Sequence, residues 1–153
     1  LADHYRQAYF KLRTAPGAKE AVFFPGMRAV LDALHAQAET YLAVATGKSR
    51  RGLDRLIKQH GLDGYFMSTQ VCDDHPSKPH PSMVLAALSD CAVEAKDAVM
   101  IGDTTYAIDM AHASSVRTIG VDWGYHDTAS LRADAVAYTA QDLHDLLSTD
   151  PTV

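Results

Sequence analysis

Three short polar stretches contain the side chains of this 153-residue chain that are best suited to chemistry. Thr46 and Gly47 form the first stretch, Lys78 stands in the second, and Asp103 belongs to the third. Hydroxyl and ammonium groups bind anionic oxygens, whereas a carboxylate is a hard oxygen ligand for Mg²⁺. Together, the three stretches therefore indicate a site that binds a phosphoryl group with a divalent metal.

Taken one at a time, the three stretches have simpler structural explanations. Thr before Gly is common in turns, Lys before Pro is common in solvated loops, and Asp after a strand often caps the next helix. Their order and spacing along one chain are much more specific. A P-loop is excluded, because a P-loop motif that ends at Ser49 requires glycine at the position where Leu42 stands.

Each stretch depends on an element that must hold it in place. The apolar run 41–45 ends at Thr46, and the run 98–101 ends at Gly102, which is typical of buried strands. Such runs alternate with helical patterns, so the sequence predicts an α/β domain with a mainly parallel sheet, whose ligands bind beyond the carboxyl ends of the strands. Further strands are expected at 65–68, 116–121 and 135–138, and helices at 3–13, 27–34, 50–60, 81–91, around 108–111, and at 141–147.

Composition and charge limit the kinds of partner. Fourteen Lys and Arg residues against nineteen Asp and Glu residues give a net charge of −5, which does not favour a nucleic acid or an anionic membrane surface. No apolar run approaches the roughly 18 residues that a membrane-spanning helix needs. Two cysteines, Cys72 and Cys91, are too few for a disulfide framework, so a cytoplasmic location is expected.

With their neighbours, the three stretches resemble motifs of the haloacid dehalogenase (HAD) superfamily. The matching segments are VATGK at 44–48, SKPHP at 77–81 and MIGDT at 100–104. The flanking sequence is most similar to the phosphoglycolate phosphatase branch, which has a small helical cap. The resemblance implies a three-layer α/β/α Rossmann-like core over residues 22–150. Residues 1–21 would be a remnant of the cap helix with its linker, and residues 151–153 a tail.

The same resemblance implies an enzyme that hydrolyses phosphate esters of small metabolites through an aspartyl-phosphate with Mg²⁺. Thr46 and Gly47 would bind the transferring phosphoryl group, Lys78 would neutralise its oxygens, and Asp103 would help to hold Mg²⁺. In such catalysis, charged groups that the folded protein already holds in place stabilise the charge that develops in the transition state. Because the cap selects the substrate in this family, the sequence does not identify the metabolite.

The family's first motif, Asp-x-Asp-Gly-Thr, does not occur in the sequence. In the family this motif ends the central strand and supplies the nucleophile and the general acid/base. A sheet without that strand would leave buried backbone groups unpaired, at about 1–3 kcal/mol each. We therefore expect a truncated chain that is inactive alone. A missing N-terminal segment or a second copy in a homodimer would complete the sheet, unless the strands rearrange.

The family's fourth motif is also altered. Ala107 stands where a second acid is expected, four residues after Asp103. Asp109 is two residues further on, which rotates it by roughly 200° about a helix axis, so its carboxylate is expected to face solvent. These departures leave an alternative function open, namely a non-catalytic HAD-like domain that binds a phosphorylated ligand or a protein partner.

Three histidines, His75, His80 and His126, fall in loops on the side of the predicted site. They could contact a substrate, but their spacing does not match a metal triad, and a surface position is the simpler interpretation. Trp123 and Tyr125 are expected to pack a loop beside the site.

Overall fold

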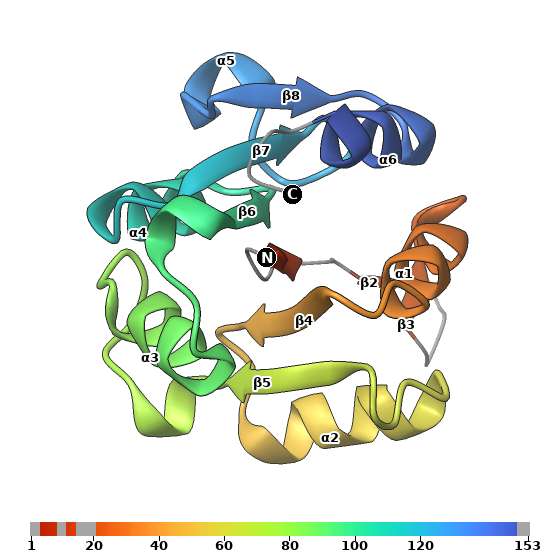
Figure 1. Cartoon of the computed structure of the whole chain (residues 1–153), viewed down its shortest axis with the longest axis vertical. Coiled ribbons are helices and arrows are strands. Elements are labelled where there is room, and N and C mark those ends of the chain that lie inside the picture. The colour runs from red at the N-terminus through yellow and green to blue at the C-terminus, as the bar shows by residue number, and fades with distance from the viewer. Residues whose placement is uncertain (1–3, 9–11, 15–20, 150–153) are drawn as a thin grey trace.

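The computed structural model describes residues 4–8, 12–14 and 21–149. Within these residues, six strands form one sheet in the order β5-β4-β1-β6-β7-β8, and β2 pairs with β3 in a separate two-stranded sheet (Figure 1). The strands are β1 (His4–Ala8), β2 (Leu12–Thr14), β3 (Ala21–Phe23), β4 (Thr40–Ala45), β5 (Phe66–Gln70), β6 (Ala98–Gly102), β7 (Arg117–Val121) and β8 (Ala135–Ala137). The α-helices are α1 (Met27–His35), α2 (Arg50–Gln59), α3 (Ser82–Cys91), α4 (Thr105–Ala113), α5 (Thr128–Leu131) and α6 (Ala140–Thr149), with 3₁₀ turns at Cys72–Asp74 and Ala95–Asp97.

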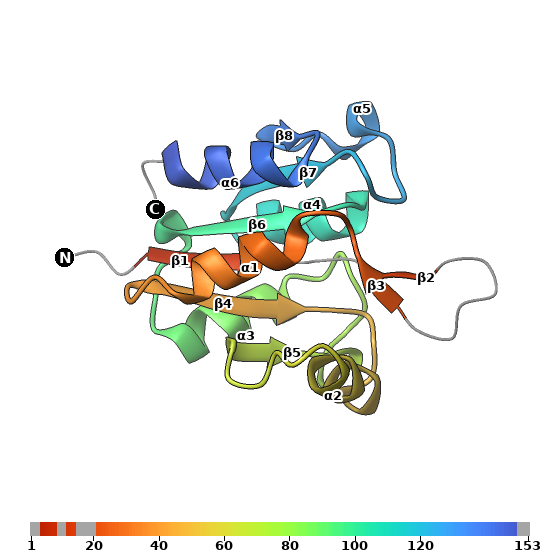
Figure 2. The ribbon, with the colours of Figure 1, turned by 90° about the vertical axis from the view of Figure 1, so that its right-hand side faces the viewer.

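Every neighbouring pair in the six-stranded sheet is parallel, which confirms the predicted fold class. Helices cover both faces of this sheet, with α1 and α6 on one side and α3 and α4 on the other (Figures 1 and 2). Successive residues of a strand point to opposite faces. Leu42 accordingly joins the cluster under α1 and α6, while Ala43 joins the cluster under α3 and α4.

The strand β1 occupies the centre of the sheet, which corrects two expectations. Tyr5 is level with Tyr41 of β4 on one side and with Ala98 of β6 on the other. The predicted helix over residues 3–13 is therefore wrong, since 4–8 and 12–14 are strands and the rest of that range lies outside the described residues. The expected lack of a central strand is wrong as well, because residues 4–8 provide one.

The physical reason is that tertiary pairing outweighs a local pattern. Apolar residues between positions 5 and 12 have helical spacing, but helix propensity is a weak preference in a short segment. Strands β4 and β6 have backbone groups that must be paired when they are buried. With β1 in place, the described sheet needs no second copy at its centre. The core boundaries at residues 22 and 150 stay a prediction, and the tail at 151–153 lies outside the described residues.

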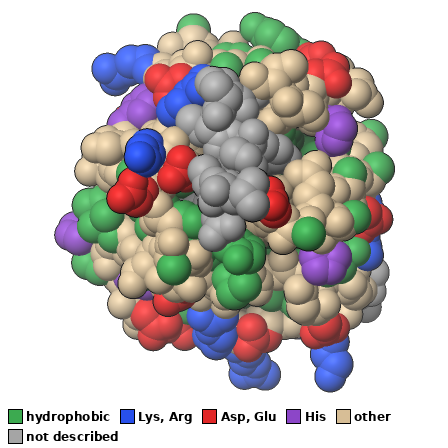
Figure 3. Space-filling view, in the orientation of Figure 1, with side chains coloured by type: hydrophobic (Ala, Val, Ile, Leu, Met, Phe, Trp, Pro, Cys, Tyr) green, Lys and Arg blue, Asp and Glu red, His purple; other side chains and the backbone are tan. Residues whose placement is uncertain are grey.

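The other predicted strands and helices are confirmed, with ends shifted by one to a few residues. The sequence did not predict α5 and β3. The short helix α5 is capped by Asp127, whose side chain accepts a hydrogen bond from the Ser130 N–H at 2.9 Å. None of the helices in the described part of the chain is both long and apolar enough to cross a bilayer. Acidic and basic side chains are interspersed over the face seen in Figure 3.

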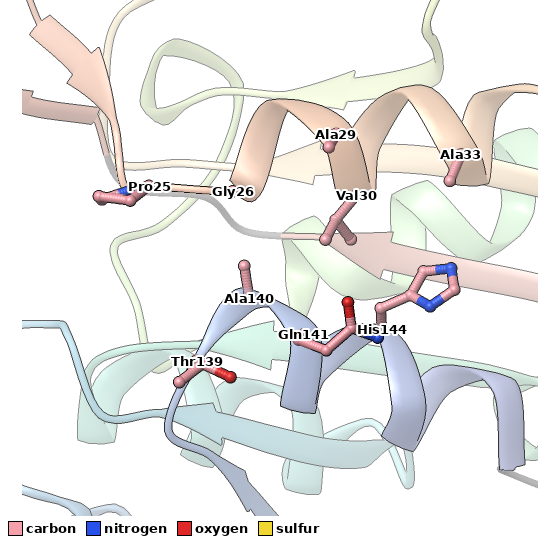
Figure 4. Close-up of a pocket in the computed structure, with 9 residues that line it drawn as sticks. All are labelled: Pro25, Gly26, Ala29, Val30, Ala33, Thr139, Ala140, Gln141 and His144. Atoms are coloured by element: carbon pink, nitrogen blue, oxygen red, sulfur yellow. The ribbon is translucent and has the colours of Figure 1, made fainter.

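A groove of about 460 Å³ lies between α1 and α6 (Figure 4). Small side chains such as Ala29, Ala33 and Ala140 line it. Gly26, which precedes α1, has a φ of +86°, and a Cβ at this position would lie 2.9 Å from the Cβ of Ala140. The close approach of α1 to α6 therefore depends on glycine at position 26.

Replacement of Gly26 by alanine should destabilise the protein by about 2–3 kcal/mol, because a left-handed backbone and a steric clash add together. The matched control is Gly61→Ala, where φ is +63° but no atom lies within 4 Å of the added Cβ. That control should cost only about 1 kcal/mol. Urea unfolding measures both free energies, and equal losses would show that the contact with Ala140 does not matter.

Candidate active site

The predicted motif residues meet at the carboxyl edge of the sheet. Tyr5 of β1 is level with Tyr41 and with Ala98, and Thr46 and Asp103 each lie five residues beyond those partners. Because the three strands are parallel, Thr46 and Asp103 leave the sheet at the same edge. They do so on either side of β1. The structure thus confirms the common position that the strand pattern predicted for these two residues.

A pocket of about 340 Å³ opens at this edge. Gly47, which follows Thr46, and Thr104, which follows Asp103, both line it, and so does Lys78 from the loop between β5 and α3. The remaining lining residues in the described structure are Cys72, Ser77, Met83 and Tyr106. The three motifs therefore contribute to one pocket, and its apolar walls come from residues that the sequence did not single out.

Thr46 is almost fully buried directly after β4. Its backbone N–H donates to the carbonyl of Gln70 at 3.0 Å, and its Oγ1 accepts the Lys48 N–H at 3.2 Å. The second bond is the turn chemistry that the sequence alone would allow. A hydroxyl can accept and donate at once, so Thr46 can still donate its own proton to an anion.

Asp103 is 1 % exposed and does not cap the following helix. The cap of α4 is Thr104, whose Oγ1 accepts the Ala107 N–H at 3.1 Å. This excludes the simple structural explanation for Asp103 and leaves its carboxylate at the edge of the sheet. The N–H of Tyr125 donates to Asp103 Oδ2 at 3.2 Å, and the N–H of His126 donates to the Asp103 carbonyl at 3.2 Å.

The loop after β7 fits closely over Asp103. A Cβ at position 124 would lie 2.0 Å from the Cβ of Asp103, so only glycine allows this contact. The sequence predicts that Trp123 and Tyr125 pack beside the site but assigns no role to Gly124 between them. The sequence signal that could have identified this contact is the glycine in the loop after β7, the strand next to β6 in the sheet.

The three loop histidines bind the protein's own backbone and side chains. His126 Nδ1 accepts the Thr105 N–H at 2.9 Å, and His80 Nδ1 accepts the Ser82 N–H at 3.1 Å. Both ring nitrogens of His75 lie within hydrogen-bond distance of side chains, Ser82 Oγ and Gln70 Oε1. The expected surface position therefore holds for His80, which is exposed, whereas His75 and His126 are partly buried.

Burial lowers the pKa of Lys78 to about 8, while the negative charge of Asp103 acts in the opposite direction. The ammonium group is still mostly protonated at pH 7. A cation with little surrounding water interacts more strongly with an anion than a solvated one does. Lys78 is thus well placed to neutralise an anionic oxygen, and it is not the solvated loop residue that its sequence context alone would suggest.

The described residues do not make a complete Mg²⁺ site. Asp103 supplies one carboxylate, and the described residues hold no group of three or more His, Cys, Asp or Glu side chains that could bind a metal. Ala107 is fully buried in the cluster that also contains Met83, so the position of the family's second acid is apolar. Asp109 is exposed on α4, as expected.

The comparisons with known proteins agree with this fold. The family model described as haloacid dehalogenase-like hydrolase matches residues 2–121. The chain therefore belongs to the haloacid dehalogenase-like hydrolase family.

Two curated relatives show how much of a longer protein the chain represents. It is 40 % identical over 129 residues to the probable phosphatase IndB of Dickeya dadantii, covering 83 % of this chain and 55 % of that protein. It is 30 % identical over 127 residues to a phosphoglycolate phosphatase of Photobacterium profundum, covering 82 % and 55 %. The chain thus spans about half the length of the curated relatives it matches.

Solved structures support the fold. A predicted phosphoglycolate phosphatase from Haemophilus somnus superposes with a TM-score of 0.75 at 24 % identity, over 82 % of this chain and 57 % of that one. A predicted phosphatase from Clostridium acetobutylicum gives a TM-score of 0.74 at 23 % identity, over 83 % and 60 %.

The free energy of unfolding should rise between about pH 8 and pH 10.5, because the unfolded chain keeps the Lys78 proton that the folded chain releases. The full change corresponds to roughly 3 kcal/mol. The Lys78→Met variant should lose this rise, whereas Lys96→Met should keep it, because Lys96 is 76 % exposed. Urea unfolding at a series of pH values measures the difference, and parallel curves for the wild type and Lys78→Met would contradict the buried position of Lys78.

Proposed function

We propose that the whole protein is a phosphatase that hydrolyses esters of small phosphorylated metabolites, and that this chain provides the phosphoryl-binding part of its site. The observation that carries the proposal is the meeting of Thr46, Lys78 and Asp103 at the carboxyl edge of one sheet. The printed names of the relatives, a probable phosphatase and a phosphoglycolate phosphatase, support the same class of reaction.

In this proposal the residues of the chain bind and orient the phosphoryl group. The Lys78 ammonium neutralises a phosphoryl oxygen, and the Thr46 hydroxyl donates to another. The turn at Gly47 has no atom within 4 Å of the place that a Cβ would take, so an anion can approach the backbone there. Such an arrangement favours the charge that develops when the phosphate ester is cleaved.

The described residues supply neither the nucleophile nor the complete set of Mg²⁺ ligands that the family's reaction needs. The route through an aspartyl-phosphate needs a nucleophilic Asp, and the sequence contains no Asp-x-Asp-Gly-Thr motif. We propose that Asp103 contacts Mg²⁺ in the whole protein, with further ligands beyond those that the described residues supply. The cytoplasmic location and the oligomeric state stay predictions.

The chain should bind inorganic phosphate, and Lys78→Met should weaken this binding by about 10- to 100-fold, as expected for the loss of a charge-assisted contact. Isothermal titration calorimetry at pH 7 measures the dissociation constant. The control is Lys96→Met, which removes an exposed cation. The same affinity for the wild type and Lys78→Met would exclude Lys78 as a phosphoryl ligand.

The purified 153-residue chain should not hydrolyse p-nitrophenyl phosphate in the presence of Mg²⁺, because the family's nucleophile is missing from its sequence. Release of nitrophenolate measures the reaction. Turnover that depends on Mg²⁺ would show that another group in the chain serves as the nucleophile.

The apolar position at Ala107 favours a second candidate function, a non-catalytic HAD-like domain that binds a phosphorylated ligand or a protein partner. The coding sequence upstream of Leu1 separates the two functions. An Asp-x-Asp-Gly-Thr motif there supports the phosphatase, and a coding sequence that lacks it supports the binding domain.

A further inference from the structure

We propose that His75 is a positioning residue of the phosphoryl site, whose ring fixes the loop that carries Lys78. The inference rests on the proposed role of Lys78 in phosphoryl binding, and it names the residue that holds Lys78 in place relative to Thr46. His75 itself lies outside the set of residues that line the pocket.

The ring of His75 joins the two ends of the Lys78 loop. His75 Nε2 lies 2.7 Å from Oε1 of Gln70, the last residue of β5. His75 Nδ1 lies 2.6 Å from Oγ of Ser82, the first residue of α3. One partner precedes Lys78 in the chain and the other follows it, so the ring closes the loop across its base.

The hydrogen bonds around Gln70 determine which ring nitrogen of His75 carries the proton. Gln70 Nε2 donates to Asp90 Oδ2 and to Ser68 Oγ, both at 2.8 Å, so its Oε1 faces His75 as an acceptor. His75 Nε2 must therefore carry a proton, and Nδ1 of the neutral ring accepts from the Ser82 hydroxyl. Reversal of the buried Gln70 amide would place its oxygen against a carboxylate.

Gln70 also connects the loop to the other phosphoryl-binding group. Its backbone carbonyl accepts the Thr46 N–H at 3.0 Å, while its side-chain Oε1 accepts the hydrogen bond from His75 Nε2. Gln70 thus helps to position both Thr46 and the Lys78 loop. The prolines in the loop restrict its φ angles but do not fix its position relative to β5.

The test is the affinity of the 153-residue chain for inorganic phosphate, measured by calorimetry for three variants. His75→Leu should weaken binding about tenfold, as expected if Lys78 loses its fixed position. His75→Gln should stay within about threefold of the wild type, because an amide can donate to Gln70 and accept from Ser82. The matched control is His144→Leu on α6, across the sheet, which should bind as the wild type does.

A double-mutant cycle separates positioning from a general loss of structure. In a Lys78→Met background, His75→Leu should cause no further loss of affinity, because the group on which it acts is absent. The same tenfold loss in that background would overturn the proposal. Long-range ¹H–¹⁵N spectra of the wild type should show His75 protonated at Nε2, and protonation at Nδ1 alone would also overturn it.

If His75→Leu does not fold, Ser82→Ala removes only one bond to the ring and should weaken phosphate binding severalfold. Wild-type affinity in a folded His75→Leu, or in Ser82→Ala where His75→Leu does not fold, would defeat this inference and leave the proposed function intact. A wild-type chain that does not bind phosphate would instead defeat the proposed function, and the inference with it.

Discussion

The hydrogen bonding of β1 with β4 and β6 is the constraint on which the rest of the structure depends. Backbone groups in the centre of a sheet must be paired, and β1 pairs with strands on both sides. That pairing sets the register between β4 and β6, and the register brings Thr46 level with Asp103. The site is therefore a consequence of strand register, and its residues need not be close in the sequence.

The polar groups at this edge are placed at a cost to the folded protein. Burial of the Lys78 ammonium lowers its pKa to about 8, which means that the charged form is less stable in the folded chain than in water. Asp103 is buried beneath a loop that leaves room for only a glycine above it. Local arrangements that reduce stability are common where a protein prepares charge for a ligand.

Most strands and helices could be predicted because their apolar residues follow regular periods. The order of the motifs was also enough to bring Thr46, Lys78 and Asp103 together. The segment around Tyr5 could not be predicted in this way, because its strand depends on partners at residues 40–43 and 98–101 that a local pattern does not contain. The contact of Gly124 with Asp103 depends on an irregular loop, which has no period.

The loops after β4 and β5 are also tied directly to each other. The Cys72 N–H donates to the Lys48 carbonyl at 3.1 Å, and the Arg50 guanidinium donates to the Thr69 hydroxyl at 2.6 Å and carbonyl at 2.7 Å. The turn after β4, the start of α2 and the end of β5 are therefore joined as one structural unit. A chimaera that takes β5 from a relative without a hydroxyl group at position 69 would lose one of the two hydrogen bonds that Arg50 donates to this strand.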